Sequence, residues 1–464
     1  MSAKPDAVKA KEANELKKWK SAKRTYRGYL LVMMSLLCVV RCLDEFASSV
    51  GSSIQSWLVN EFIVIPTGVS YAEGLSTWSL ISTAMMVFTI LAVFYLALSD
   101  RFGRKRILVI SVFGMAAGML ICFTARQFPV YLLGTALVTF FIATDVHGIY
   151  VMEIAPPEKR AIFGQTTAVF GQVGTFLVAL SRIRYTVDDM LNWRMLYLIP
   201  GIVGLVSGIL LILSARETPV FLKQRIAHLS SSQEEPQGDA QTAKPPKASE
   251  KGKQGIGAAF RYIFTHKQTR GNILATVPQL LAIMAFTGYT ESIMTTNHMS
   301  TSDVNKALLM VPILAAAVSV LTGLLSDHLG RRPTAIVTSI LAFLGFIGFI
   351  LTAQGRVNPY FIGIVYGLCN GSFFRYGDTL GLQRLESVPT NIRAAVASAF
   401  GLIATVIALT SGILLGILVS RFDLSRLCLI WGGITLGLSA LLNLLLVKET
   451  KGIDLDRVET AFES

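Results

Sequence analysis

The chain has 464 residues, a mean hydropathy of +0.56 and a formal net charge of +13, with 52% hydrophobic and only 15% charged residues. Soluble domains carry about 25% charged residues, so this composition excludes an ordinary soluble protein. The apolar residues form continuous blocks such as Leu30–Val40 and Leu402–Val419, unlike the alternating segments of a transmembrane β-barrel. Because backbone groups in lipid must be satisfied within the spanning segment, these blocks predict membrane-spanning helices.

The chain begins with a basic segment, residues 1–28, followed by an apolar run. This order superficially resembles a signal peptide, but the run is too long and contains Arg41, Asp44 and Glu45. We therefore predict a basic cytoplasmic tail followed by a first membrane helix that is retained.

Further along the chain, apolar blocks of suitable length recur at regular intervals. They predict an all-α membrane protein with twelve transmembrane helices, at 29–55, 75–98, 107–125, 128–152, 161–181, 195–214, 272–295, 306–325, 333–353, 358–383, 392–420 and 425–447.

Lysine and arginine decide the orientation of these helices. Most of the 42 basic residues lie in the two tails and in alternate loops. Positive charge marks the cytoplasmic side, so we expect both termini to be cytoplasmic in a multi-pass protein of the cell membrane. The same distribution argues against a nucleic-acid partner, whereas contact of the tail with anionic lipid headgroups stays open beside a plain orientation signal.

Residues 229–255 are polar and contain prolines, which predicts a disordered cytoplasmic linker. The expected organisation is a six-helix half at 29–214, a partly disordered linker at 215–271, a second six-helix half at 272–447 and a tail at 448–464.

The two halves repeat the same short motifs in the same order. Residues 99–105 recur at 326–332, residues 153–161 recur at 386–394, and residues 216–218 recur at 448–450. Two related halves imply a pseudo-twofold axis along the membrane normal, with a solute site between the halves near the midplane.

These motifs resemble those of the major facilitator superfamily. Residues 100–105 and 327–332 are similar to the family's G-x-x-x-D-R-x-G-R-K signature between its second and third, and its eighth and ninth, helices. The E-x-x-P-x-x-x-R motifs and the segments after helices six and twelve resemble the sugar-porter branch and its metabolite–proton symporter relatives. The resemblance covers essentially the whole chain and implies the twelve-helix major facilitator fold.

The sequence also departs from that branch. An arginine early in helix four is linked to proton coupling in the family, but residues 131–134 read Tyr-Leu-Leu-Gly. The glutamine-rich pattern of sugar porters in helix seven is absent from residues 286–292. A sugar substrate and the usual proton relay are therefore not implied.

The resemblance assigns the loop motifs to a gate that closes the cytoplasmic side, although hairpin packing alone is the alternative. The gate candidates are Asp100, Arg101, Gly103, Arg104, Glu153, Arg160, Asp327, Gly330, Arg331, Glu386 and Arg393.

Ionisable residues at membrane depth mark a pathway or a relay by default. They fall on predicted helices one, four, seven and ten, which line the central cavity by resemblance, and no other span interior holds one within the predicted boundaries. These residues are Arg41, Asp44, Glu45, Asp145, His147, Glu291, Arg375 and Asp378. Arg41 with the two acids, and Arg375 with Asp378, are spaced to pair within a helix, either as self-neutralising pairs or as pairs that open on binding.

Asp44 resembles in position the helix-one aspartate of sugar porters and is the first candidate for the proton site. Glu291 has no neighbouring cation in sequence, so it is either a second proton site or a protonated hydrogen-bonding group. His147 could carry protons or simply pack. Tyr289 and Asn370 could line a solute pocket or pack.

Arg41 and Arg375 are the two basic residues expected at depth, and arginine suits carboxylate recognition. The sequence thus predicts a monomeric secondary transporter of a small organic acid or related metabolite, coupled to H+ as a symporter. Multidrug efflux and facilitative sugar or polyol transport are the alternatives. No nucleotide-binding loop, nucleophile elbow or metal-ligand motif occurs, so an enzyme, a cofactor and a bound metal are not expected.

Overall fold

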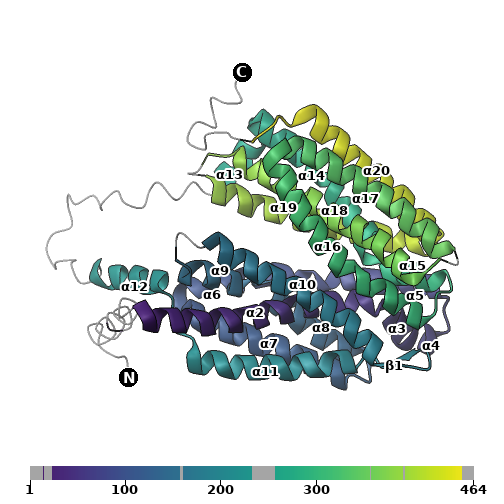
Figure 1. The fold of residues 1–464 in the computed structure, drawn as a ribbon, viewed down its shortest axis with the longest axis horizontal. Coiled ribbons are helices and arrows are strands. Elements are labelled where there is room, and N and C mark those ends of the chain that lie inside the picture. The colour runs from purple at the N-terminus through teal and green to yellow at the C-terminus, as the bar shows by residue number, and fades with distance from the viewer. Residues whose placement is uncertain are drawn as a thin grey trace. The chain divides into compact units, whose positions relative to one another are not determined.

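The computed structural model describes residues 14, 23–156, 160–231, 256–355, 357–389 and 392–451. These residues are almost entirely helical (Figure 1). The one sheet among them is a short antiparallel hairpin, in which β1 (Thr186–Val187) pairs with β2 (Met190–Leu191). The predicted linker disorder, the N-terminal tail up to residue 22 (Asn14 apart) and the C-terminal tail from residue 452 lie outside the described residues.

The helices of the first half of the sequence match the predicted spans closely. Their bounds are α2 Lys23–Ser53, α3 Gln55–Val59, η1 Asn60–Val64, α4 Ile65–Thr67, α5 Tyr71–Met85, α6 Val87–Phe102, α7 Arg104–Thr124, α8 Phe128–Ile142, α9 Val146–Ile154, α10 Arg160–Arg184, α11 Met195–Ser214 and α12 Pro219–Ser231.

The second half begins with a short helix and continues with six long segments. Their bounds are α13 Ile256–Thr265, α14 Lys267–Ile283, η4 Met284–Gly288, α15 Thr290–Thr296, α16 Thr301–Leu329, α17 Arg331–Gln354, α18 Pro359–Glu386, α19 Arg393–Val419 and α20 Leu424–Leu446.

Among the described residues, ten helical segments are long and apolar enough to cross a membrane. The helices α2 and α18 have 31 and 28 residues, more than the roughly 20 that a bilayer requires. They correspond to predicted spans one and ten, and both carry charged residues in their interiors, which lowers their hydropathy. Both helices carry candidate site residues, namely Arg41, Asp44 and Glu45 on α2 and Asn370, Arg375 and Asp378 on α18.

The chain divides into two compact units whose composition does not follow the halves of the sequence. The first unit contains residues 1–51, 85–178 and 192–245, and the second contains 52–84, 179–191 and 246–464. Within the first unit α7 packs against α8 and α11, and within the second unit α18 packs against α16 and α17. Residues 52–84 and 179–191, from the first half of the sequence, therefore belong to the second unit.

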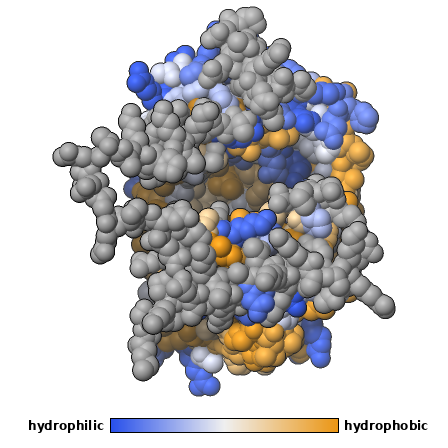
Figure 2. All heavy atoms as spheres, turned by 90° about the vertical axis from the view of Figure 1, so that its left-hand side faces the viewer, coloured by the Kyte–Doolittle hydropathy of each residue, from blue (hydrophilic) through white to orange (hydrophobic). Residues whose placement is uncertain are grey.

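Both units have apolar interiors and apolar outer surfaces. Leu37, Val112 and Tyr150 belong to a buried cluster of the first unit, and Ile263 and Val396 to one of the second. Many large apolar side chains are exposed instead, and Figure 2 shows hydrophobic residues, in orange, along its right-hand and lower margins. A helix whose outward face is apolar is suited to contact lipid.

Predicted helices four and seven are interrupted next to candidate site residues. Predicted helix four, at 128–152, breaks between α8 and α9, where Asp145 adopts a left-handed conformation with φ of 40°. Predicted helix seven, at 272–295, passes through the π-helical η4 and restarts at α15, directly before Glu291. Hydropathy could not locate these breaks, because one to three non-helical residues scarcely change the apolar average.

Candidate functional site

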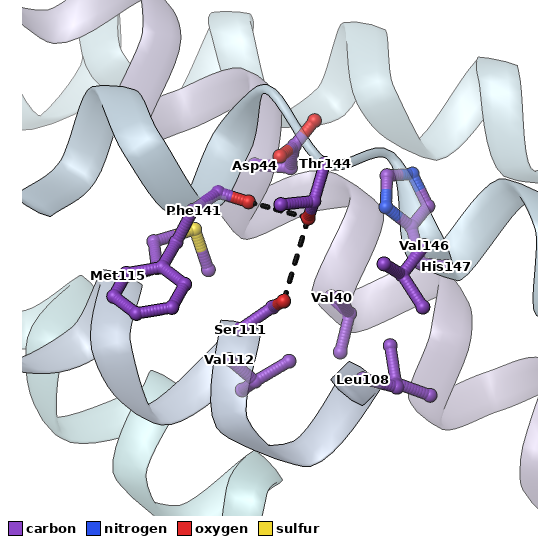
Figure 3. A pocket seen from close by; sticks show the side chains of 10 residues that line it. All are labelled: Val40, Asp44, Leu108, Ser111, Val112, Met115, Phe141, Thr144, Val146 and His147. Carbon is purple, nitrogen blue, oxygen red and sulfur yellow. Dashed lines mark hydrogen bonds between the residues drawn. The ribbon is translucent and has the colours of Figure 1, made fainter. Parts of the chain in front are cut away.

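A pocket in the first unit lies beside the break in helix four (Figure 3). Its enclosed volume is about 20 Å³, enough for about one water molecule. In Figure 3 the side chains of Asp44 and His147 lie on opposite sides of Thr144. The Thr144 hydroxyl donates to the Phe141 carbonyl at 2.8 Å and to the Ser111 hydroxyl at 3.4 Å. The remaining lining is mostly apolar: Val40, Leu108, Val112, Met115 and Val146.

Arg41 is the centre of a charged cluster at this pocket. Its Nη1 donates to Asp44 Oδ2 at 2.9 Å, and its Nη2 donates to Glu45. His147 Nε2 lies 3.5 Å from the same Nη1 of Arg41 and 3.2 Å from Asp145 Oδ1. Five predicted site residues on two helices therefore meet, and carboxylates outnumber arginines in the cluster.

Exposure differs sharply among these acids. The Asp44 side chain is 12% exposed, whereas that of Asp145 is 72% exposed. Asp145 has a left-handed backbone conformation and its side chain points outward, whereas His147, the second residue of α9, faces the pocket. The helix break thus places the imidazole between the exposed Asp145 and Arg41, and Arg41 in turn binds the buried Asp44.

A second site residue, Glu291, lies in the other unit and is almost completely buried. It accepts hydrogen bonds from the backbone N–H and the hydroxyl of Ser56 at 2.7 and 2.5 Å, and Arg182 Nη1 lies 3.8 Å from its carboxylate. A buried charge thus lies just beyond the predicted end of helix five, in the last turn of α10. Arg182 was assigned to a loop because the predicted span ended at residue 181, and it is fully buried.

The other candidates of the second unit contact residues of the same unit. Arg375 Nη1 pairs with Asp378 Oδ2 at 2.8 Å, as their spacing allows. The Tyr289 hydroxyl lies 2.9 Å from the Ser79 hydroxyl, and Asn370 Nδ2 donates to the Tyr366 hydroxyl at 3.3 Å.

The first copy of the gate motif forms a compact ionic cluster. Arg104 Nε donates to Glu153 Oε1 at 3.1 Å, and Thr218 Oγ1 donates to the other oxygen of Glu153 at 2.5 Å. Glu217 accepts the backbone N–H groups of Arg104 and Lys105 at the start of α7. Gly103, with φ of 99°, lies so close to Glu217 that a side chain there would clash.

The second copy repeats this geometry within the second unit. Arg331 Nε donates to Glu386 Oε1 at 3.2 Å, Thr450 Oγ1 donates to Glu386 Oε2 at 2.5 Å, and Glu449 accepts the N–H groups at the start of α17. Sequence reasoning recognised the segments containing Glu217 and Glu449 but did not include these acids among the gate residues.

The remaining gate candidates behave differently from one another. Gly330 has φ of 106°, and Asp327 pairs with Arg331 at 3.0 Å. Arg393 donates to the Val388 carbonyl rather than to an acid. The side chains of Asp100, Arg101 and Arg160 lie outside the described residues.

The two helix-capturing glutamates, which lie outside the membrane spans, have opposite pKa shifts. Burial raises the pKa of Glu217 above its ordinary 4.5, although the N–H groups of Thr218, Lys105 and Arg104 oppose the change. Burial also acts on Glu449, but backbone N–H groups, that of Lys451 first, outweigh it and lower the pKa.

A family model described as "Sugar (and other) transporter" matches residues 22–462. Among similar proteins, the glycine betaine/proline/ectoine/pipecolic acid transporter OusA of Dickeya dadantii (strain 3937) is 25% identical over 373 residues, covering 74% of this chain and 68% of the relative. The chloroplastic D-xylose-proton symporter-like 3 of Arabidopsis thaliana is 26% identical over 407 residues, covering 78% and 70%.

Solved structures with the same fold include that of a D-xylose-proton symporter, with a TM-score of 0.69, 18% identity and coverage of 92% of this chain and 100% of that one. The inward-open xylose transporter XylE of E. coli has a TM-score of 0.68, 16% identity and coverage of 93% and 99%. The predicted twelve-helix major facilitator fold and the predicted family are confirmed. The chain belongs to the sugar (and other) transporter family of the major facilitator superfamily, and is a multi-pass membrane transporter of small molecules rather than an enzyme.

Proposed function

We propose that the chain is a proton-coupled symporter for a small zwitterionic solute of the betaine or amino-acid type. The observation that carries the proposal is the charge balance at the first-unit pocket, where Asp44, Glu45 and Asp145 surround Arg41 and His147. An excess of carboxylates attracts a cationic group and disfavours a purely anionic solute.

This proposal refines the organic-acid prediction made from the sequence. That prediction relied on Arg41 and Arg375 as binding groups for a substrate carboxylate. Both arginines already pair with acids of their own helix, so a free anion would have to compete with those acids. A zwitterion carries both charges. Its carboxylate could bind the arginine while its cationic group binds the displaced acid, so no charge is left unpaired.

The similar proteins support the same solute class. The solutes named for OusA are glycine betaine, proline, ectoine and pipecolic acid, each of which combines a carboxylate with a positively charged nitrogen. The name of the Arabidopsis relative includes proton symport. Other relatives are named as hexose or glucose transporters, so a neutral sugar is the competing solute.

Asp44 is the residue to which we assign the proton. It lines the pocket and shares Arg41 with Glu45. An ionisable group at membrane depth belongs by default to a pathway or relay. With Asp44 neutralised by a proton, Arg41 would bind Glu45 alone, so the local charge would differ between loaded and unloaded states. We assign the exposed Asp145 and the adjoining His147 to the path by which the proton approaches the cluster around Arg41.

The transport cycle follows from two related halves that alternate in access about a central site. We further propose that the chain acts as a monomer in the cell membrane, with H+ as the coupling ion.

The test is uptake into proteoliposomes with an imposed inside-alkaline pH gradient. The solutes would be glycine betaine, proline, a dicarboxylate, D-xylose and a cationic drug. We expect glycine betaine or proline to accumulate above equilibrium with the wild type and only to equilibrate with Asp44→Asn.

Two further variants sharpen this experiment. Glu45 shares Arg41 with Asp44. If Glu45→Gln loses accumulation and Asp44→Asn keeps it, the proton site is Glu45 instead of Asp44. Asp303→Asn alters an exposed pair with Lys306 in the other unit and should leave uptake unchanged. Accumulation of the dicarboxylate alone, of D-xylose alone or of the drug alone would contradict the zwitterion proposal.

A further inference from the structure

A buried layer of polar contacts in the second unit joins segments that are far apart in the sequence. Tyr71 donates to the Ser292 hydroxyl at 3.1 Å, and that hydroxyl donates to Gln55 Oε1 at 2.9 Å. The Ser76 hydroxyl donates to the Gly416 carbonyl at 2.6 Å. Residues 52–84 and 179–191, from the first half of the sequence, are thus bound to helices of the second half.

Two buried charges lie within this layer. Arg182, at the end of α10, is 0% exposed, and Glu291, at the start of α15, is 1% exposed. Arg182 donates through Nε to Asn305 Oδ1 at 2.7 Å and through Nη1 to the Ser53 carbonyl. Four segments of the chain therefore meet at one ion pair, since Ser56 of α3 binds the Glu291 carboxylate from the other side.

We infer that Arg182 and Glu291 form a charge latch that holds the outer end of the transporter closed, with Arg182 as a positioning residue of the transport cycle. "Outer" denotes the side opposite the gate motifs. The inference rests on the alternating-access part of the proposed function, because opening this end would have to part the first-half segments from the second half.

The geometry of the pair favours a reversible contact. The charged atoms are 3.8 Å apart, longer than a good hydrogen bond, and Arg182 Nη2 is buried without a hydrogen-bond partner among the described residues. Burying two charges removes their hydration, which offsets much of their attraction. Both charges would regain water if the segments separated, so the ion pair itself contributes little net free energy to the closed arrangement.

The small net contribution of the pair predicts that removing one charge and removing both charges have opposite effects on the closed arrangement. Glu291→Gln leaves the Arg182 charge buried and uncompensated, which penalises the closed arrangement strongly. The double variant Arg182→Met with Glu291→Gln removes both charges, and replacing a buried pair by uncharged groups is often neutral or stabilising. The single variant should therefore open the outer end, and the double variant should keep it closed.

The experiment is hydrogen–deuterium exchange of the full chain in nanodiscs, without solute, followed on peptides covering 52–59 and 289–297. We expect exchange in Glu291→Gln to be about tenfold faster or more, which corresponds to about 1.4 kcal/mol. In the double variant we expect exchange at or below the wild-type rate. Asp303→Asn is the matched control, because Asp303 lies near Asn305 on the same helix but forms an exposed ion pair. This variant should not change the exchange rate of the two peptides.

Three outcomes would overturn the latch. One is unchanged exchange of the outer peptides in Glu291→Gln. Another is faster exchange throughout the chain in both variants with a similarly lowered melting temperature, which marks a merely structural pair. The third is Glu291→Gln uptake that no longer responds to the pH gradient while the outer peptides stay protected, which marks a proton carrier. Failure of the proposed function would instead appear in the Asp44→Asn uptake measurement, which is independent of this exchange.

Discussion

Gly171 of α10 shows how closely the charged cluster of the first unit is packed. A Cβ at this position would lie 2.9 Å from Glu45 Cγ and 3.2 Å from Arg41 Nε. Neither atom can move freely, because Arg41 is bound to both Asp44 and Glu45. The absence of a side chain at residue 171 thus allows α10 to approach the cluster.

Gly171→Ala should therefore disturb the site. We expect a loss of about 1–3 kcal/mol of stability from overpacking, together with slower pH-driven uptake because Arg41 is displaced. Thermal unfolding and proteoliposome uptake of the same preparation measure the two effects.

Gly164 on the same helix is the matched control. Its Cβ would meet nothing within 4 Å, so Gly164→Ala should stabilise the helix by about 0.5–1 kcal/mol and leave uptake unchanged. Equal effects of the two substitutions would show that Gly171 matters for helix flexibility rather than for the cluster.

At the scale of elements, a glutamate captures the start of a helix in each copy of the gate. Glu217 binds the first N–H groups of α7, and Glu449 binds those of α17. A carboxylate is favourable at a helix N-terminus because unpaired N–H groups and the helix dipole attract it. The greater burial of Glu217 reverses the sign of its pKa shift relative to Glu449.

These shifts predict opposite responses to pH. The lowered pKa of Glu449 contributes stability above pH 4.5, and this contribution is lost as the pH falls through the lowered value. Glu449→Gln should thus be less stable than the wild type near pH 7, and the difference should vanish in acid.

The raised pKa of Glu217 acts in the other direction. Its contribution is present below pH 4.5 and is lost as the pH rises through the raised value. Glu217→Gln, which resembles the protonated side chain, should be as stable as the wild type in acid and no less stable near pH 7. Thermal unfolding of both variants across this range is the measurement, and shifts of the same sign would contradict the assignment.

For the whole molecule, the even number of spans and the distribution of basic residues predict that both termini share the cytoplasmic side. In sealed inside-out vesicles, protease should remove epitope tags from both ends, and in right-side-out vesicles it should remove neither. A tag cleaved at one end only would require an odd number of crossings. An inserted protease site in the 232–255 segment, expected on the same side, serves as the internal control.

Much of the candidate site could be predicted from the sequence because its members are local. The pairs of Arg41 with Asp44 and Glu45, and of Arg375 with Asp378, follow from helical spacing alone. The partners of Glu291 could not be found in this way. Ser56 and Arg182 are far from it in sequence, and each is a polar residue near a helix end.

The sequence by itself determined the family, the number of spans and the repeated gate motifs, since these depend on hydropathy and on residues close together in the chain. Only the tertiary structure decided the break at Asp145, which brings His147 to the pocket, and the burial of Arg182 against Glu291. Hydropathy averages over about one helix length, so it places a segment in the membrane but cannot specify which segments meet. That choice depends on packing and on the pairing of buried charges between distant helices.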